Sequence, residues 1–204
     1  MFLSERFLLN MRKLGYIGGL AGLIILVFLL VGIFSKSILL EQDITINRPA
    51  KKVYYAMLNP MKMKEWLVGF EKVEALDGFL YGPGSRYLLT FNYGGHELKV
   101  LQEVTVFEWK RELGLKMTFP HITVLTSILF DPTDKGTQLN IKNKISGNNL
   151  FWKSLTPLLK PWLQDNFDQN FINLKQFLEK PHEGNTPHEG NTPPEGSPPP
   201  EGRP

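Results

Sequence analysis

Hydrophobic and polar positions follow three successive patterns along the 204-residue chain, and each pattern predicts a different kind of element. An unbroken apolar run fills residues 14–34. Apolar and polar residues then alternate over most of residues 70–146, as they do in strands that have one face in water. From residue 150 to residue 180, apolar residues recur every three or four positions, as in a helix with one buried face.

The apolar run has the length and composition of a transmembrane helix. Residues 14–34 would form a helix about 31 Å long, close to the hydrocarbon thickness of a bilayer. They include no charged side chain, whereas Arg12 and Lys13 precede them and Lys36 follows. A cleaved signal peptide and a buried core helix are the alternatives, but no convincing small-x-small cleavage site lies before Glu41.

A strand and two short helices are expected next. Residues 38–47 alternate and end just before Pro49, where a helix can begin because the missing N–H of proline needs no partner there. Residues 50–58 place their apolar side chains on one face. An Asn-Pro pair then ends that helix, and residues 61–67 predict a second one.

Six further strands, joined by glycine-rich or proline-containing turns, predict an antiparallel meander with one wet face. They cover residues 70–76, 85–93, 96–107, 109–117, 121–130 and 137–146. One face of the third strand should carry His96, Leu98, Val100, Gln102, Val104 and Val106. The fifth strand is apolar on both faces, and Leu125 is assigned to its inner face, so that Thr123 and Ser127 share that face.

A long amphipathic helix closes the domain. Its apolar stripe consists of Leu155, Leu159, Leu163, Phe167, Phe171, Leu174 and Leu178. Pro157 and Pro161 should kink the helix or delay its start until after Lys160. The stripe must be buried, and the inner face of the sheet is the partner available to it.

Charge and composition narrow the classes of partner. The net charge of +3 divides into +2 for residues 1–35, +4 for residues 36–180 and −3 for residues 181–204, which is too little basic charge to indicate nucleic-acid binding. The chain has no cysteine, which excludes disulfides, a thiol nucleophile and thiolate metal ligands. A slight excess of basic residues before the apolar run favours a cytoplasmic N-terminus, with the domain on the periplasmic or extracellular face.

These patterns together divide the chain into five parts. They are an N-terminal flank at residues 1–13, a transmembrane helix at 14–34, a linker at 35–38, a folded domain at 39–180 and a tail at 181–204. The tail repeats a six-residue unit four times, rich in proline, glycine and glutamate, and we expect it to be disordered because it has almost nothing to bury.

The order of elements resembles that of the START-like superfamily, also called SRPBCC, which includes the birch pollen allergen, lipid-transfer domains and proteins labelled polyketide cyclase. The resemblance is carried by ITINRPAKKVYYAMLNPMKMKEWL, by FEKVEALDGFLYGPGSRY with its Gly-Pro-Gly turn, and by DPTDKGTQLNI, in that order. It implies an α+β helix-grip fold, in which a curved antiparallel sheet packs on a long C-terminal helix.

The resemblance also implies a largely apolar cavity between the sheet and the C-terminal helix. Candidate pocket residues are Trp66, Tyr87, Leu89, Phe91, Leu98, Arg111, Leu113, Leu115, Leu125, Ser127, Leu163, Phe167 and Phe171. Such a lining suits an apolar or amphipathic small molecule. The same side chains are also what an ordinary filled core would need, and the sequence leaves both possibilities open.

Residues suited to acid–base chemistry are few. His96 and His121 begin strands, where a solvated histidine is usual, and Arg111 either points inward to hold an acidic group or lies at the strand end with a carboxylate. No paired carboxylates, phosphate loop, nucleophile elbow or metal-ligand spacing is present in the sequence. We therefore predict no catalytic residue, no metal and no cofactor.

The favoured hypothesis is a membrane-anchored START-like domain that binds a lipid, a quinone or a similar hydrophobic molecule. Its expected partners are the lipid bilayer and that ligand, and the oligomeric state stays open. A polyketide-cyclase-like enzyme and a non-catalytic scaffold with a filled core are the two alternatives.

Overall fold

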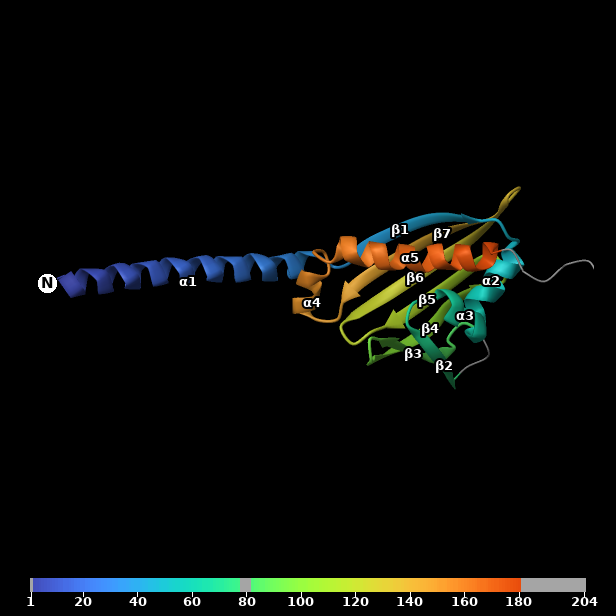
Figure 1. The fold of residues 1–204 in the computed structure, drawn as a ribbon, viewed down its shortest axis with the longest axis horizontal. Coiled ribbons are helices and arrows are strands. Elements are labelled where there is room, and N and C mark those ends of the chain that lie inside the picture. The colour runs from blue at the N-terminus through green and yellow to red at the C-terminus, as the bar shows by residue number, and fades with distance from the viewer. Residues whose placement is uncertain (1, 78–81, 181–204) are drawn as a thin grey trace, which may run out of the picture.

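A computed structural model describes residues 2–77 and 82–180, and for residues 2–14 it describes the backbone alone. A seven-stranded antiparallel sheet curves around one long helix, and a second long helix projects away from the domain (Figure 1). This is the helix-grip architecture of the α+β class that the sequence predicted. The repeat tail, at residues 181–204, lies outside the described residues.

The strands form the predicted meander, closed at one edge by the first strand. They are β1(Ile38–Ile46), β2(Phe70–Asp77), β3(Arg86–Tyr93), β4(His96–Glu108), β5(Glu112–Thr118), β6(Ile122–Thr133) and β7(Gly136–Gly147). Their order across the sheet is β1-β7-β6-β5-β4-β3-β2, so β1 pairs with the last strand and β2 lies at the opposite edge.

Five helices complete the fold of the described residues. They are α1(Phe2–Phe34), α2(Ala50–Leu58), α3(Pro60–Trp66), α4(Leu150–Leu155) and α5(Lys160–Glu179). Leu155 belongs to α4 and not to α5, because the chain turns between the two helices and α5 starts at Lys160, with Pro161 in its first turn. The delayed start predicted from the two prolines is confirmed.

Glycines allow two close turns that fix the strand register. Gly94 and Gly95 both have positive φ (62° and 90°) and join β3 to β4 as a tight hairpin, as expected for a Gly-Gly pair. Gly136 has a φ of 135°, and a Cβ there would lie 2.3 Å from the carbonyl oxygen of Ile46. That close approach brings the end of β1 against the start of β7.

A β-bulge in β4 changes which side chains of that strand face inward. Val104 pairs with Leu115, but the next pair joins Val106 to Gly114, so Thr105 is the extra residue. Phe107 consequently pairs with buried Leu113 and contacts Tyr54, with 5.7 Å between the ring centroids. The prediction that Val106 shares the inner face with Val104 is wrong beyond the bulge.

The core consists of two clusters on the inner face of the sheet. The larger one joins the sheet to α2, α3 and the C-terminal half of α5, through residues such as Tyr54, Trp66 and Phe171. The smaller one lies where β1, β6 and β7 meet the first turns of α5, and its buried members are Ile38, Leu40, Val124, Ile145 and Leu163. As predicted, α5 buries its apolar stripe against the sheet.

The N-terminal helix has the properties of a candidate membrane span. Its segment Gly15–Phe34 has a mean hydropathy of 2.8, and little of it is buried against the rest of the chain. By length and composition this helix could cross a bilayer or act as a signal sequence. Only residues 35–37 separate its end from β1.

Candidate functional site

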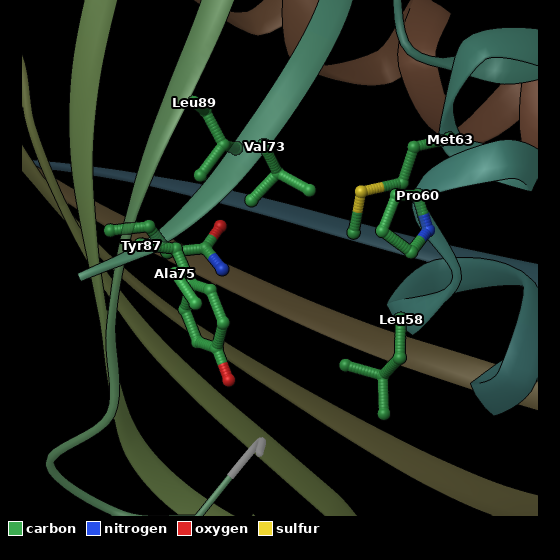
Figure 2. Close-up of a pocket in the computed structure, with 8 residues that line it drawn as sticks. Leu58, Pro60, Met63, Val73, Ala75, Tyr87 and Leu89 are labelled. Atoms are coloured by element: carbon green, nitrogen blue, oxygen red, sulfur yellow. The ribbon is translucent and has the colours of Figure 1, made fainter. Parts of the chain in front are cut away.

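The candidate site is a cavity of about 170 Å³ between the α2–α3 corner and the β2 edge of the sheet (Figure 2). The residues that line it are Leu58, Pro60, Met63, Val73, Ala75, Tyr87, Leu89 and Gln102. Figure 2 shows Leu58, Pro60 and Met63 facing the β2 and β3 residues across the space. Since Ala75 is exposed and Val73 half-buried, the cavity opens toward the edge of the sheet.

Asn59 builds the helical wall of this cavity. Its Oδ1 accepts a hydrogen bond from the backbone N–H of Met61 at 2.9 Å, and its Nδ2 donates to the hydroxyl of Tyr55 at 2.7 Å. The first bond caps α3 just as α2 ends, and Pro60 fits the first turn of α3 because its missing N–H needs no partner there. The resulting corner places Leu58 and Met63 over the sheet.

The strand register builds the opposite wall. Val73 pairs with Leu89, Ala75 pairs with Tyr87, and Tyr87 pairs with Gln102 of β4. Period-two alternation therefore turns these side chains to the same face of three neighbouring strands. Gln102 and Tyr87 are both buried, so one amide and one phenol lie among aliphatic groups.

The end of α3 is fixed to α5 on the far side of the corner. The indole N–H of Trp66 donates to the carbonyl oxygen of Ala56 at 3.3 Å, and its ring lies 6.5 Å from that of Phe171 in α5. Asn173 Nδ2 donates to the carbonyl oxygen of Trp66, and Asn170 Oδ1 accepts from the N–H of Val68. These contacts hold α3 in place and leave no α5 side chain in the cavity lining.

The lining sets the chemistry that the cavity can accommodate. Ligand pockets are usually ~300–1,000 Å³, and a dry cavity of ~150 Å³ can hold a benzene ring. The volume here therefore suits one ring or a short branched chain, with the amide of Gln102 as a hydrogen-bonding group. A longer ligand would extend through the open β2 edge or displace Met63, whose unbranched side chain repacks easily.

Two of the residues proposed from the sequence line the cavity, namely Tyr87 and Leu89. Eight others pack elsewhere in the two core clusters, and they are Trp66, Phe91, Leu98, Leu113, Leu115, Leu163, Phe167 and Phe171. This cavity lies beneath α3, whereas the sequence placed a cavity between the sheet and α5, and that second location stays a prediction.

Three proposed pocket residues face away from the core. Arg111 lies in the β4–β5 turn with a side chain that is 82% exposed and pairs with Glu108 at 3.6 Å, so its inward orientation is wrong. Leu125 is exposed on the outer face, opposite Lys116, and the hydroxyl of Ser127 donates to Glu112 Oε1 at 3.1 Å. The inward-facing residues of β6 are instead the even-numbered ones, such as Val124, Ile128 and Phe130.

The two histidines of the folded domain, His96 and His121, also lie outside the cavity lining. His96 is exposed at the start of β4. His121 precedes β6, and its ring stacks on Trp152 of α4 with 4.5 Å between the centroids. The described residues that line the cavity include neither of these two histidines and no arginine. Among the side chains that the structure describes, at residues 15–77 and 82–180, no three His, Asp or Glu groups gather as a metal-binding site would require.

Sequence reasoning missed six of the lining residues, which are Leu58, Pro60, Met63, Val73, Ala75 and Gln102. One signal was available. Gln102 is a polar residue at an inward position between Val100 and Val104, and a buried amide in an apolar face often marks a binding site. The other five became neighbours only when α3 folded over the β2 edge.

The domain resembles solved structures of the same fold. They include protein CV1439 from Chromobacterium violaceum, the protein of unknown function SA2116 from Staphylococcus aureus, and Ara h 8.0201. Their identities to this chain are 16%, 14% and 12%, with TM-scores of 0.55, 0.59 and 0.58. The matches cover 69%, 72% and 70% of this chain and 96%, 96% and 97% of those chains. A comparison with curated proteins gave no match.

A family profile identifies the domain more directly. The profile described as polyketide cyclase/dehydrase and lipid transport matches residues 37–179, which is more than half of the chain. That description supports a hydrophobic ligand-binding domain in general. The chain therefore belongs to the polyketide cyclase/dehydrase and lipid transport family, and its domain has the START-like helix-grip fold.

Proposed function

We propose that this protein is a membrane-anchored domain that binds a hydrophobic or amphipathic small molecule in the cavity between α3 and strands β2–β4. The observation that carries the proposal is the lining, in which aliphatic side chains surround one buried amide and one buried phenol. Such a site favours a ligand with an apolar body and a single polar group.

The anchor in this proposal is α1. Its segment Gly15–Phe34 is apolar on every side and leaves large side chains such as Leu20, Leu23 and Ile24 uncovered. Water would leave these side chains unfavourably solvated, whereas a bilayer would accommodate them. Arg12 and Lys13, on the other side of the span from the domain, favour an orientation with the N-terminus in the cytoplasm and the domain outside.

The short connection to the anchor favours a ligand taken from the membrane. Residues 35–37 can reach at most about 10 Å when extended, so an α1 embedded in a bilayer would keep β1 close to the membrane surface. Lipids, quinones and similar molecules are then the most concentrated hydrophobic ligands nearby. We place a membrane-derived ligand ahead of a soluble metabolite for this reason.

The test starts from the full chain purified in detergent. Organic extraction and mass spectrometry should find a co-purifying hydrophobic molecule, and a fluorescent hydrophobic dye should bind to protein from which that molecule has been removed. Absence of both a co-purifying molecule and dye binding would contradict the proposal.

Two matched variants place the ligand in the cavity. Val73→Trp puts an indole into the β2 wall, and we expect dye binding to fall at least about tenfold because the ring occupies the ligand's space. Leu76→Trp adds the same ring to an exposed position of the same strand and should leave binding unchanged. Equal binding by both variants would move the ligand out of this cavity.

A further inference from the structure

A strongly apolar surface at the junction of α4 and α5 is unexplained by the cavity or by the core. Residues 150–162, termed the α4–α5 elbow, read LFWKSLTPLLKPW and include no acidic residue. The elbow exposes Leu150 by 41%, Phe151 by 54%, Leu158 by 68% and Trp162 by 61%. A group of large apolar side chains of this kind marks an interaction surface more often than chance exposure does.

The elbow packs directly against the last turns of α1. The rings of Phe28 and Phe151 lie 5.6 Å apart. A Cβ added to Gly32 would lie 2.1 Å from the hydroxyl oxygen of Ser154 and 2.7 Å from the carbonyl oxygen of Leu150, so only glycine allows this approach. Figure 1 shows α4 beside the end of α1, where that helix joins the domain.

This contact sets the depth of the elbow relative to the apolar helix. Phe28 precedes Phe34 by six residues, which corresponds to about 9 Å along a helix axis. Amphipathic elements at a membrane surface lie ~5–10 Å deep, at the boundary between headgroups and acyl chains. If α1 crosses a bilayer, α4 therefore lies at that boundary.

The polar groups of the elbow are arranged as a lipid environment requires. Ser154 donates to the carbonyl oxygen of Leu150 at 3.0 Å, and Thr156 donates to that of Trp152 at 2.6 Å. Asn149 caps α4 by accepting from the N–H of Trp152 at 3.0 Å. Internal pairing of hydroxyls and backbone groups lowers the free energy of entering a medium that offers no hydrogen bonds.

The charged groups of the elbow suit the lipid headgroups. Lys153 and Lys160 are exposed and are its only ionisable side chains. Lysines can extend from an apolar surface to reach phosphate groups, and tryptophan and phenylalanine favour the same interfacial layer.

We propose that the α4–α5 elbow is an interfacial lipid-binding element that inserts beside α1 and seats the domain against the bilayer. The inference rests on the anchoring role proposed for α1 and adds a second contact between the chain and lipid. In this arrangement α4 and α1 enter the same leaflet together. The end of the domain that carries the elbow is therefore held at the membrane surface.

The absence of cysteine allows a direct test by spin labelling, since each introduced cysteine is the only one in the chain. Nitroxides are attached to Leu158→Cys in the elbow, Leu23→Cys in α1 and Met61→Cys on α3, which is 75% exposed and serves as the matched control. The full chain is placed in vesicles of phosphatidylcholine and phosphatidylglycerol. Collisions with oxygen report lipid, and collisions with a water-soluble nickel chelate report water.

We expect nickel collisions at position 158 to be about tenfold lower than at position 61, with higher oxygen collisions, because a polar chelate is excluded from the acyl boundary. Equal nickel collisions at positions 158 and 61, with position 23 still in lipid, would contradict the lipid-binding role of the elbow. They would leave the anchoring role of α1 unaffected. Low collisions with both reagents at position 158 would assign this face to a second copy of the chain and would also contradict the lipid-binding role. An aqueous signal at position 23 would contradict the anchor and the elbow together.

Discussion

The two edges of the β-sheet, at β1 and at β2, differ in how their inward side chains are covered by helices. At the β1 edge, all nine residues of β1 pair with β7, and the inner positions hold large side chains that α5 covers. At the β2 edge, the pairing with β3 has two register shifts, most of β2 is exposed, and the short helix α3 provides the cover. Large buried side chains pack beneath α5 at the first edge, termed the filled edge, and the second edge, termed the hollow edge, contains the cavity.

The difference shows where this domain leaves space. A long helix lying along regular strands allows each inward side chain to meet another, and close packing follows. A seven-residue helix turned at Asn59-Pro60 reaches only part of an irregular strand edge, so aliphatic groups such as Leu58 and Leu89 face each other across a gap. The hollow region arises from the length of its cover and not from a special lining sequence.

The largest expected effect on stability comes from truncating a buried side chain at the filled edge. Ile145 is fully buried between β1 and β6, opposite Ile38 and Val124. Ile145→Ala should lower the free energy of unfolding by about 2–5 kcal/mol, because the site cannot collapse around the lost atoms. Denaturant unfolding of the full chain in detergent, followed by circular dichroism, measures the loss. A change below about 1 kcal/mol would show that the filled edge is loosely packed.

A second experiment enlarges one side chain at each edge of the sheet instead of truncating one. Val124→Phe should lower the free energy of unfolding by about 1–3 kcal/mol, because Val124 is fully buried in the filled edge. Val73→Phe, at the cavity wall, should change it by less than about 1 kcal/mol, since the ring can enter existing space. The same denaturant measurement compares the two, and equal losses would contradict the contrast between the two edges.

The larger core cluster buries the hydroxyl of Tyr54 without a hydrogen-bond partner among the described residues, which lowers the stability of the fold. Tyr54 is fully buried against Phe107, Trp109 and Phe130, and no described residue hydrogen-bonds its hydroxyl. Tyr54→Phe should therefore raise the free energy of unfolding by about 1 kcal/mol at neutral pH. Denaturant unfolding at pH 7 measures the gain, and a loss of stability would show that the hydroxyl has a partner.

Tyr54 should also make the stability of the protein depend on pH in the alkaline range. Burial raises the pKa of Tyr54 from 10.0 to about 12. The unfolded chain then ionises first, so stability is complete below pH 10 and falls between pH 10 and about pH 12. Tyr54→Phe should remove this contribution to the alkaline loss, whereas Tyr55→Phe at an exposed position of the same helix should retain it.

The smallest effect concerns the end of the hollow edge. Arg86 pairs with Asp77 and joins the last residue of β2 to β3. The Arg86 guanidinium, through its hydrogen bonds, lowers the pKa of Asp77 below its ordinary value of 3.8. The stability from this pair is present above pH 3.8 and is lost as the pH falls through the lowered pKa.

Arg86→Gln provides the test of that pair. The variant should be slightly less stable than the unmodified chain at pH 7, and the difference should disappear in strong acid, once Asp77 is protonated in both. Because both side chains are exposed, we expect the effect to be small and to weaken in salt. Denaturant unfolding at both pH values measures it, and a difference that persists in acid would assign it to packing of the arginine stem.

Alternation and turn chemistry were enough to predict most of the strands and helices, and β6 shows where they fail. Both faces of β6 are apolar, because Val124, Ile128 and Phe130 alternate with Leu125 and Leu129. The inward face is decided by the register with β5, in which Leu115 pairs with Thr126 and Met117 with Val124. A strand's own sequence holds no information about that register when its two faces are equally hydrophobic.

The cavity was less predictable than the fold for a related reason. Whether facing apolar side chains touch or leave a gap depends on the angle and reach of the α2–α3 corner, and these are tertiary properties. The bulge at Thr105 likewise reversed the predicted facing of Val106 and Phe107, which lie outside the cavity lining. Only Gln102 carried a local sign of the site, as a polar residue within an inward-facing apolar strand.

The joint between α1 and β1 has a mechanical consequence. A pull on α1, directed away from the domain, would pass through residues 35–37 into β1 along the direction of that strand. The load would then act in shear on the register from Ile38↔Ile145 to Ile46↔Thr137, so that the nine pairs resist it together and do not open one at a time. A domain attached in this way should withstand tension between α1 and the sheet, with a rupture force set by the β1–β7 ladder.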